Sequence, residues 1–334
     1  MKWNKGYTST YYMAVVDKAT WRDIQRIEIT GGNIDRTIDG LRESATIDCT
    51  DYPDDIEVWI RVWLDTNQDG AYDHVPLFTG LATSPEVDID GTRQSRSLEA
   101  YSVLKPVADI NLLRGWYAPA GMSGGAVIRD LLSATPAPVV IADNAPALSS
   151  NIIAADNETR LEMIENVLTA INWQLRIDGD GTINVIPKDD TPVATFDPLD
   201  NAVIETQITV SADWFNCPNV FMAVDEDLTA IARDDSLTSL VSTVNRGREV
   251  WMQDSNCELA ANESIEQYAQ RRLKEEQQIQ TSASYDRRYV PGVYPGSVVR
   301  LHYPEQGLDG LYKVTSQGVE IGFSARTSEE IITL

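Results

Sequence analysis

Cysteine and histidine are scarce in this chain, which has three cysteines and two histidines in 334 residues. Disulfide frameworks and structural zinc sites need closely spaced sets of these residues, whereas Cys49, Cys217 and Cys257 lie far apart. We therefore expect three buried thiols, without a disulfide or a zinc ion. Neither His74 nor His302 belongs to a His-Glu-x-x-His helix, and no phosphate-loop lysine is present. The chain is expected to carry no catalytic residues and no cofactor, and not to be an enzyme.

Long apolar runs are also missing. No stretch of about 18 apolar residues occurs, so no membrane span is expected, and residues 1–16 lack the apolar core of a signal peptide. The chain is therefore expected to fold in the cytoplasm of the cell that makes it. With 334 residues, 43% of them hydrophobic, it is long enough for two or three compact domains.

Positive charge is in short supply, because 27 Lys and Arg stand against 51 Asp and Glu, giving a formal net charge of −24. Affinity for nucleic acid phosphate comes from Lys and Arg that displace counterions, so DNA binding by the general surface is not expected. A negative surface keeps a protein soluble, and it would also stop DNA from adhering if it lined a channel. The residues alone leave both interpretations open.

The first region, residues 1–105, consists of one strand-like segment after another, with Gly and Asp turns between them. These segments are residues 11–17, 24–30, 44–50, 56–65, 72–90 and 96–104. Short strands at this spacing are typical of a small antiparallel barrel or sandwich. Along residues 57–65 both sets of alternate positions carry large side chains, so both faces of that strand are expected to be covered.

The second region, residues 106–188, changes to helix periodicity. Residues 125–133 and 158–172 are predicted helices, the second with a cap at Asp156 or Asn157. The second helix runs into two short strands joined by residues 178–181, Asp-Gly-Asp-Gly, which is a hairpin signal because Asp-Gly pairs accept positive φ. We predict an inserted helix-plus-hairpin α/β module. The Ala- and Pro-rich residues 134–151 are expected to run as an extended excursion over the surface or onto a partner.

The third region, residues 189–334, places strands on either side of a charged helix predicted at about 262–280, with Asn262 as its cap. Pro-Gly pairs at 291–292 and 295–296 each predict a turn, and residues 225–240 are expected to form an acidic loop. The predicted fold class is α+β and mainly β. It comprises two small antiparallel β-barrels with inserted helix-plus-hairpin α/β modules, the second barrel lying in this third region.

One segment resembles a calcium loop. The residues at positions one, three, five and nine of an EF-hand-like pattern are Asp65, Asn67, Asp69 and Asp73. Position twelve is Pro76, where a calcium loop has a bidentate acid, and the flanking segments are predicted strands. A polar hairpin tip is the better interpretation, with calcium binding as the alternative, and no other metal ligand is expected.

Two further function classes remain as alternatives. A cell-wall glycoside hydrolase needs only two carboxylates about 5 to 9.5 Å apart, and the abundant acids allow many such pairs. A receptor- or glycan-binding module needs exposed aromatic side chains, and eight tryptophans are spread over the three regions. The glycine-rich residues 121–126 offer backbone amides to an anion, but they are better interpreted as the entry to a helix.

Three segments, one from each region, resemble the tail hub or baseplate hub proteins of bacteriophages, also called the N-terminal part of tail-associated proteins. Residues 73–88 are similar to the strand of these proteins that carries an apolar-Phe-x-Gly step. Residues 159–187 are similar to their helix followed by Trp, a strand and an Asp-Gly hairpin. Residues 262–301 resemble their charged helix followed by a Pro-Gly-x-x-Val step, and the three segments occur in the expected order.

The resemblance implies an architecture and a structural function. Members of the family carry two barrels shaped like tail-tube subunits, and three subunits form a ring of six barrels. Such a hub adapts the sixfold tube to a threefold tip, closes it, and lets the tape-measure protein and DNA pass. The implied location is the tail tip or baseplate of the virion. The implied partners are two more copies in a homotrimer, the tail tube or distal tail protein ring, the tape-measure protein, and a tip, spike or fibre protein, with DNA only in transit.

Overall fold

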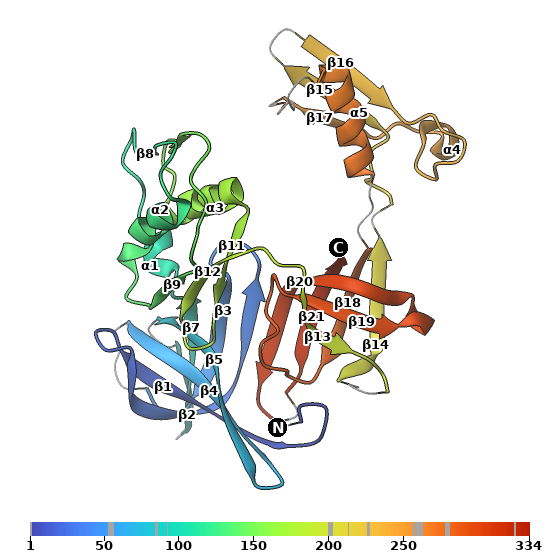
Figure 1. Ribbon diagram of the computed structural model, residues 1–334. Helices are drawn as coiled ribbons and strands as arrows, with labels where there is room; N and C mark the ends of the chain where they lie inside the picture. Colours follow the sequence, from blue (N-terminus) through green and yellow to red (C-terminus); the bar gives the residue numbers. More distant parts are fainter. Residues whose placement is uncertain are drawn as a thin grey trace. The chain divides into compact units, whose positions relative to one another are not determined.

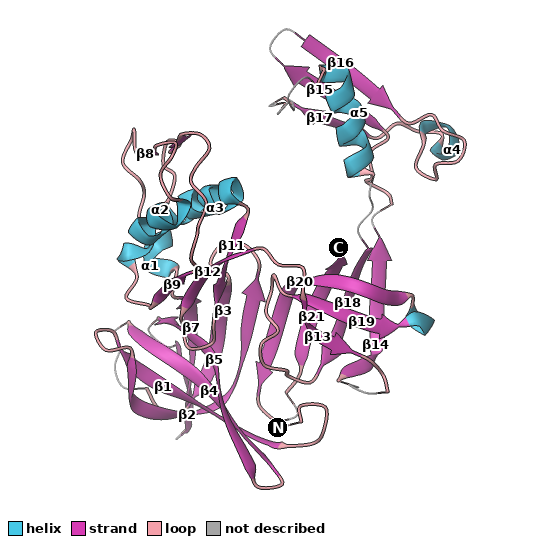
Figure 2. Cartoon of the chain, in the orientation of Figure 1, coloured by secondary structure: helices cyan, strands magenta, loops and turns pink. Residues whose placement is uncertain are grey.

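The chain, described by a computed structural model, is mainly β (Figures 1 and 2). It divides into two compact units, unit 1 with residues 1–208 and 284–331, and unit 2 with residues 209–283 and 332–334. The predicted boundaries at residues 105 and 188 stay predictions. The structure describes residues 2–52, 57–83, 86–91, 93–199, 203–212, 214–225, 228–255, 257, 263–277, 281–323 and 325–334.

A closed ring of strands forms the first part of unit 1. Its members are β1 (Thr8–Asp17), β2 (Arg22–Thr37), β3 (Glu43–Cys49), β4 (Val58–Gln68), β5 (Ala71–Ala82) and β7 (Arg93–Ser102). The order is β1-β4-β5-β7-β3-β2, every neighbouring pair is antiparallel, and β1 pairs again with β2. β6 (Glu86–Asp90) pairs with β7 beside the ring. The strands predicted for this region are therefore confirmed as elements.

The core of the ring is apolar, and β4 shows how it is built. Ile60 and Val62 are fully buried inside the ring, as alternation along a strand requires. Trp59 and Arg61 point to the opposite face and are also buried, with exposed fractions of 8% and 6%. The prediction that both faces of this strand are covered is confirmed, and Trp59 belongs to the core of the next module.

Three helices and two small sheets follow the ring and pack around one apolar core. The elements are α1 (Lys105–Ala108), β8 (Tyr117–Ala118), α2 (Gly124–Leu131), η1 (Leu132–Ala134), β9 (Val139–Ile141), β10 (Ile152–Ile153), α3 (Arg160–Ile171), β11 (Trp173–Ile177) and β12 (Ile183–Pro187). The two predicted helices and the predicted hairpin are present. The prediction of an extended excursion over residues 134–151 is partly wrong, because β9 lies within this segment. β9 pairs parallel with β12 through its β-branched residues Val139, Val140 and Ile141.

The cap of α3 differs from the prediction. Thr159 is the N-cap, and its hydroxyl accepts a hydrogen bond from the backbone N–H of Glu162, whose carboxylate accepts one from the backbone N–H of Thr159. This reciprocal capping box satisfies two backbone donors that a helix start leaves free. The predicted caps Asp156 and Asn157 precede it, and Asn157 takes a left-handed conformation with φ of 65° that suits the loop before a helix.

Replacing Thr159 by alanine is expected to lower the free energy of unfolding by about 1 kcal/mol, because one N-terminal donor of α3 loses its partner. Urea unfolding of the intact chain measures the loss. Thr169→Ala is the matched control, since Thr169 is exposed in the last turn of the same helix. An equal loss in both variants would show that the capping hydroxyl contributes nothing specific.

A second set of strands lies mostly in unit 1. It comprises β13 (Pro192–Phe196), β14 (Ile204–Ala212), β18 (Thr281–Arg287), β19 (Val298–Tyr303), η2 (Pro304–Gln306), β20 (Leu308–Ile321) and β21 (Thr327–Thr333). β20 pairs with β2 of the ring, and the order then runs β20-β21-β18-β14. β19 lies along β20, and β13 is parallel to β19. Among the pairings of the described residues this second set does not close on itself, so the ring is the one closed arrangement seen there.

The two predicted Pro-Gly turns lie between β18 and β19. Gly292 and Gly296 have φ of 82° and 88°, values that glycine adopts without steric cost. The backbone N–H of Ser297 donates to the carbonyl of Tyr294, which closes the second turn. β19 then alternates between buried and exposed residues, as the sequence predicted.

Unit 2 is a small sheet with one helix against it. Its elements are β15 (Val220–Asp225), β16 (Leu228–Arg233), β17 (Trp251–Asp254), α4 (Thr243–Arg246) and α5 (Ile265–Glu276). The sheet order is β16-β15-β17. The prediction of an acidic loop over residues 225–240 is wrong in part, because this segment contains β16. In β16 small buried alanines alternate with exposed residues, and nearby charged residues conceal this pattern in the sequence.

The charged helix α5 packs on this sheet by a narrow apolar face. Tyr268, Ala269 and Leu273 are buried against β15 and β16. Ser264 and Gln267 form a capping box at its start, whereas the predicted cap Asn262 lies outside the described residues. In the part of the chain that the structure describes, no helix has both the length and the apolar character needed to cross a membrane.

Candidate functional site

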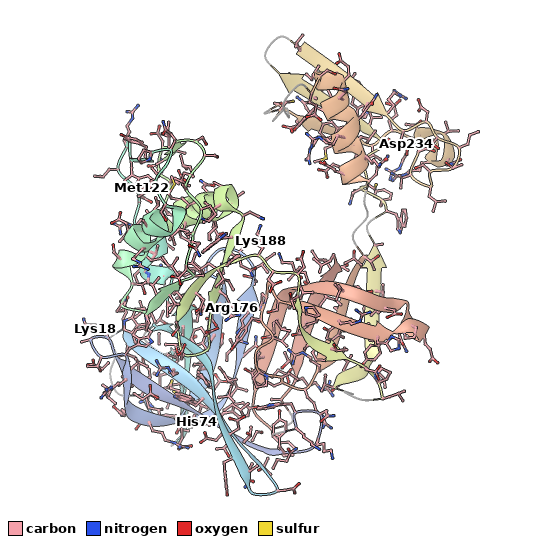
Figure 3. All side chains as sticks on the ribbon, in the orientation of Figure 1. Lys18, His74, Met122, Arg176, Lys188 and Asp234 are labelled. Atoms are coloured by element: carbon pink, nitrogen blue, oxygen red, sulfur yellow. The ribbon has the colours of Figure 1, made fainter. Side chains whose placement is uncertain are left out.

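The four residues of the predicted calcium loop lie on the hairpin between β4 and β5: Asp65, Asn67, Asp69 and Asp73. Asp65 holds Nδ1 of His74 at 2.5 Å, and Asp73 accepts the backbone N–H of His74. Figure 3 labels His74 on this hairpin. Asn67 accepts the N–H of Gly70 in the turn. The local hydrogen bonds suit a polar hairpin tip. Among the described residues no three His, Cys, Asp or Glu side chains gather as ligands, and calcium binding stays a prediction.

The glycine-rich start of α2 also fits the Gly-x-Ser-x-Gly pattern of a hydrolase nucleophile elbow, with Ser123 in the middle. Such an elbow needs a strand that runs directly into the turn and a histidine within reach of the serine. Ser123 instead follows a turn and is the N-cap of α2, and its backbone pairs with Ala147. Both histidines pair elsewhere, His74 with Asp65 and His302 with Asp309. The segment is a helix entry, as predicted.

The three cysteines stand outside disulfides. Cys49 and Cys217 are buried, but Cys257 is only half-buried, so the prediction of three buried thiols is wrong for that residue. Of the eight tryptophans, all of them described, only Trp214 and Trp251 are exposed, to 49% and 50%. Both belong to unit 2, so a glycan platform built on tryptophan would lie there.

The Asp-Gly hairpin between β11 and β12 docks on the outer face of the ring. The Thr79 hydroxyl of β5 donates to the Gly179 carbonyl at 2.8 Å. The indole N–H of Trp21 and the guanidinium of Arg61 donate to the Asp180 carbonyl at 2.9 and 3.1 Å. Arg61 is itself held by Asp23 at 2.6 Å. The ring therefore binds the backbone of the turn, and this contact fixes the helix-plus-hairpin module to it.

A buried polar network joins the ring to the second set of strands. Glu329 on β21 accepts from Arg287 at 2.5 Å and from the Tyr285 hydroxyl at 3.0 Å, both on β18. Gln317 on β20 donates to Glu329 at 2.8 Å and accepts from Arg36 of β2 at 2.5 Å. Each of these side chains is buried. A buried charge is tolerated only when it is paired and hydrogen-bonded, so these contacts tie four strands together.

Glu43 of β3 lies at the ring end of this network. Its carboxylate is 3.5 Å from Nε of Arg36, both side chains are 3% exposed, and neither Glu43 oxygen has a hydrogen-bond partner among the described groups. Burial raises the pKa of Glu43 to about 8, although Arg36 opposes the shift. A small cavity of about 20 Å³ lies beside them, also lined by Arg176 and Tyr294.

Glu43 is expected to make stability depend on pH. Its pKa is higher in the folded chain than in the unfolded chain, so the folded state binds more protons. The contribution of protonated Glu43 to the free energy of unfolding is therefore lost as pH rises towards 8. Relative to Glu43→Gln, the natural chain should lose at least about 1 kcal/mol of unfolding free energy between pH 6 and pH 8. Urea unfolding at both pH values tests this. Glu28→Gln, at an exposed carboxylate of β2, is the control, and equal pH slopes in all three proteins would refute the expectation.

The network was not anticipated from the sequence, although a signal for it exists. Ala283, Tyr285 and Arg287 alternate on one buried face of β18, and Glu329 lies between Thr327 and Ile331 on the buried face of β21. A charged residue at an inward position of an alternating strand indicates a buried partner. The sequence could thus have indicated both charges, but not that they meet.

Several apolar side chains remain exposed and are candidates for interfaces. The described residues exposed by more than two-thirds are Tyr72, Ile89, Leu113, Ile153, Leu199, Phe215, Leu237, Leu240 and Phe323. Some of them lie at strand ends, including Leu199 after β13 and Phe323 after β20. Contiguous exposed apolar patches mark protein–protein contact surfaces, so those of these residues that come together in an assembly would be buried there.

Neither a protein-family model nor a curated protein sequence matches the chain. Among solved structures, a tail protein of Neisseria meningitidis is similar with a TM-score of 0.67 and 17% identity, over 97% of this chain and 96% of that chain. The 43 kDa tail protein of prophage MuSo2 from Shewanella oneidensis has a TM-score of 0.66 and 13% identity, over 97% of both chains.

A third similar structure is the Escherichia coli c3393 protein, a component of the type VI secretion system that is structurally similar to the T4 tail proteins gp27 and gp5. Its TM-score is 0.52 at 8% identity, over 96% of this chain and 76% of that chain. The chain thus has the fold of these phage tail proteins. The predicted resemblance is confirmed at the level of the fold.

Proposed function

We propose that this chain is a structural tail hub, located at the tip or baseplate of a phage tail. The observation that carries the proposal is that the fold is shared over 97% of this chain and 96% of the Neisseria tail protein, so the likeness includes both units. The closed ring and the second strand set are then the two barrels of a hub subunit, the second completed in the assembly. The sequence-level resemblance in all three regions points the same way.

The proposed hub is a homotrimer that adapts the sixfold tube to a threefold tip. It contacts the tail tube or a distal tail protein ring, holds the tape-measure protein, and carries a tip, spike or fibre protein beyond it. The formal charge of −24 suits a lumen through which DNA passes without adhering. Adhesion would need many Lys and Arg side chains, which bind DNA phosphates and release their counterions. Such a hub functions through its contacts with other proteins. The proposed role is therefore structural and not enzymatic.

Trimer formation is tested by the solution mass. Light scattering after size exclusion, over a wide range of protein concentration, should give a mass approaching three times the 37.0 kDa of the chain. The exposed apolar side chains described above supply the surface that trimer formation would bury. A stable dimer, or a monomer at every concentration, would contradict a hub that trimerises before it meets the tube.

A further inference from the structure

The small polar cavity beside Glu43 lies where three parts of unit 1 meet. Its walls come from the end of β2 and the start of β3 in the ring, from β11 of the helix-plus-hairpin module, and from the connection between β18 and β19. A volume of about 10–15 Å³ is enough for one water molecule, so a cavity of about 20 Å³ holds a single small particle. The residues that carry its chemistry are Arg36, Arg42, Glu43, Arg176 and Tyr294.

Four buried polar atoms of these lining residues have no hydrogen-bond partner among the described groups. They are the Nε atoms of Arg36 and Arg42 and both carboxyl oxygens of Glu43. Nε of Arg36 lies 3.5 Å from Glu43, and both side chains are only 3% exposed. A buried polar group without a partner costs free energy. Four such atoms around one cavity indicate a ligand that they share.

The surroundings of Glu43 favour the neutral form of its side chain. An ionised carboxylate in the interior is stable only when donors surround it, and no described group donates a hydrogen bond to Glu43. Burial raises the pKa of Glu43 to about 8, although the nearby Arg36 lowers it. At neutral pH the carboxyl group therefore holds a proton, which it can donate to a ligand in the cavity.

When Glu43 is neutral, Arg36 has no anionic partner among the described groups. Its guanidinium donates to the amide oxygen of Gln317 at 2.5 Å and to the carbonyl of Leu77, and both acceptors are uncharged. Glu329 lies on the other side of Gln317, but it is paired with Arg287. Arg36 is thus a buried cation whose hydrogen-bond partners are all neutral.

The charges around the cavity show which kind of ligand fits. The charged and titratable groups around Glu43 are Arg36 of β2, Arg42 between β2 and β3, Glu165 of α3, Arg176 of β11, Asp178 after it, and Tyr294. Glu165 holds Arg42 at 2.5 Å. Asp178 holds Arg176 at 3.1 Å. Three arginines therefore face two carboxylates, and one positive charge is left over. A buried charge is tolerated only when it is paired, so the fitting ligand is an anion.

We propose that this cavity binds a single chloride ion together with the proton on Glu43. The ion accepts hydrogen bonds from Nε–H of Arg36, from Nε–H of Arg42 and from the protonated carboxyl group of Glu43. A water molecule could accept some of these bonds, but it would leave the positive charge unpaired. When Glu43 loses its proton, its own negative charge takes the place of the ion. The binding of chloride is therefore coupled to the uptake of one proton.

Nuclear magnetic resonance of the chloride ion tests the proposal on the intact chain, because the chloride line broadens when the ion exchanges with a protein site. At pH 6 the chain should broaden the line. Sodium bromide should restore a narrow line, whereas sodium sulfate at the same ionic strength should not, because sulfate is too large for the cavity. The affinity should fall about ten-fold between pH 6 and pH 9, as Glu43 loses its proton. A narrow line at pH 6, or equal broadening at both pH values, would overturn the proposal.

Substitutions separate the cavity from weak binding over the general surface. Glu43→Gln should remove the change in affinity between pH 6 and pH 9, because an amide donates a hydrogen bond at every pH. Arg42→Met removes one donor and should weaken chloride binding by about ten-fold. Arg114→Met is its control, at an arginine that is 91% exposed and should have little effect.

Two results would assign the broadening to the surface and refute the site. One is an equal loss in Arg42→Met and Arg114→Met, and the other is an unchanged dependence on pH in Glu43→Gln. None of these outcomes bears on the solution mass, so the chloride site and the hub are judged separately.

Discussion

Replacing Arg287 by methionine should lower the free energy of unfolding by about 3–5 kcal/mol, among the largest effects of any single substitution in this chain. Arg287 and Glu329 are both fully buried as side chains, and their atoms approach to 2.5 Å. The variant leaves the Glu329 carboxylate in the interior without its cation, with only Tyr285 and Gln317 as donors. Urea unfolding of the intact chain measures the loss.

Two comparisons show whether the effect comes from the buried charge. The double variant Arg287→Met with Glu329→Leu should be more stable than Arg287→Met alone, because replacing a whole buried pair by apolar residues is often neutral or stabilising. Arg26→Met removes an exposed ion pair with Glu28 and should cost about 0–1 kcal/mol. A loss for Arg287→Met no larger than that for Arg26→Met would mean that the network does not hold the strands together.

Gly179→Ala should cost about 3 kcal/mol, because the turn has no room for a side chain. A Cβ at this position would lie 1.9 Å from the Pro76 carbonyl oxygen and 2.6 Å from its carbon, and these are backbone atoms that cannot move aside. The hairpin would have to lift from the ring, and the bond from Thr79 to the Gly179 carbonyl would be lost. Urea unfolding and hydrogen exchange of residues 173–187 report the change.

The control is Gly6→Ala, since a Cβ at Gly6 meets nothing within 4 Å. It should leave stability nearly unchanged. If Gly179→Ala behaved like Gly6→Ala, the hairpin would not be docked closely on β5, and the account of how the module is fixed would be wrong.

Local patterns predicted the types of the elements well. A local pattern can be recognised in the sequence because it involves only neighbouring residues. Examples are the alternating residues of β4, the Asp-Gly hairpin and the apolar face of α5. The failures are equally instructive. The sequence predicted Asp156 or Asn157 as the cap of α3, whereas Thr159 caps it through a reciprocal contact with Glu162. The acidic residues around β16 concealed its alternating pattern.

Contacts between distant parts of the chain could not be predicted from the sequence. The approach of Arg36 to Gln317, and of Arg61 to Asp180, joins residues 281 and 119 positions apart, and no local pattern encodes such a meeting. A groove beside β14 likewise forms from residues about a hundred positions apart, with 197–199, 204–206 and 208 on one side and 302–306 on the other. Docking surfaces are harder still, because an exposed apolar residue such as Leu199 differs from a core residue only in its surroundings.

The most direct measurement of the hub proposal is electron cryo-microscopy of tails isolated from particles that contain this chain. The account predicts three copies in a ring at the distal end of the tube, with the closed ring and the second strand set alternating as six similar barrels around the lumen. Acidic side chains of the chain should face that lumen. Finding the chain along the tube, in a peripheral fibre, or absent from the tail tip would contradict the account.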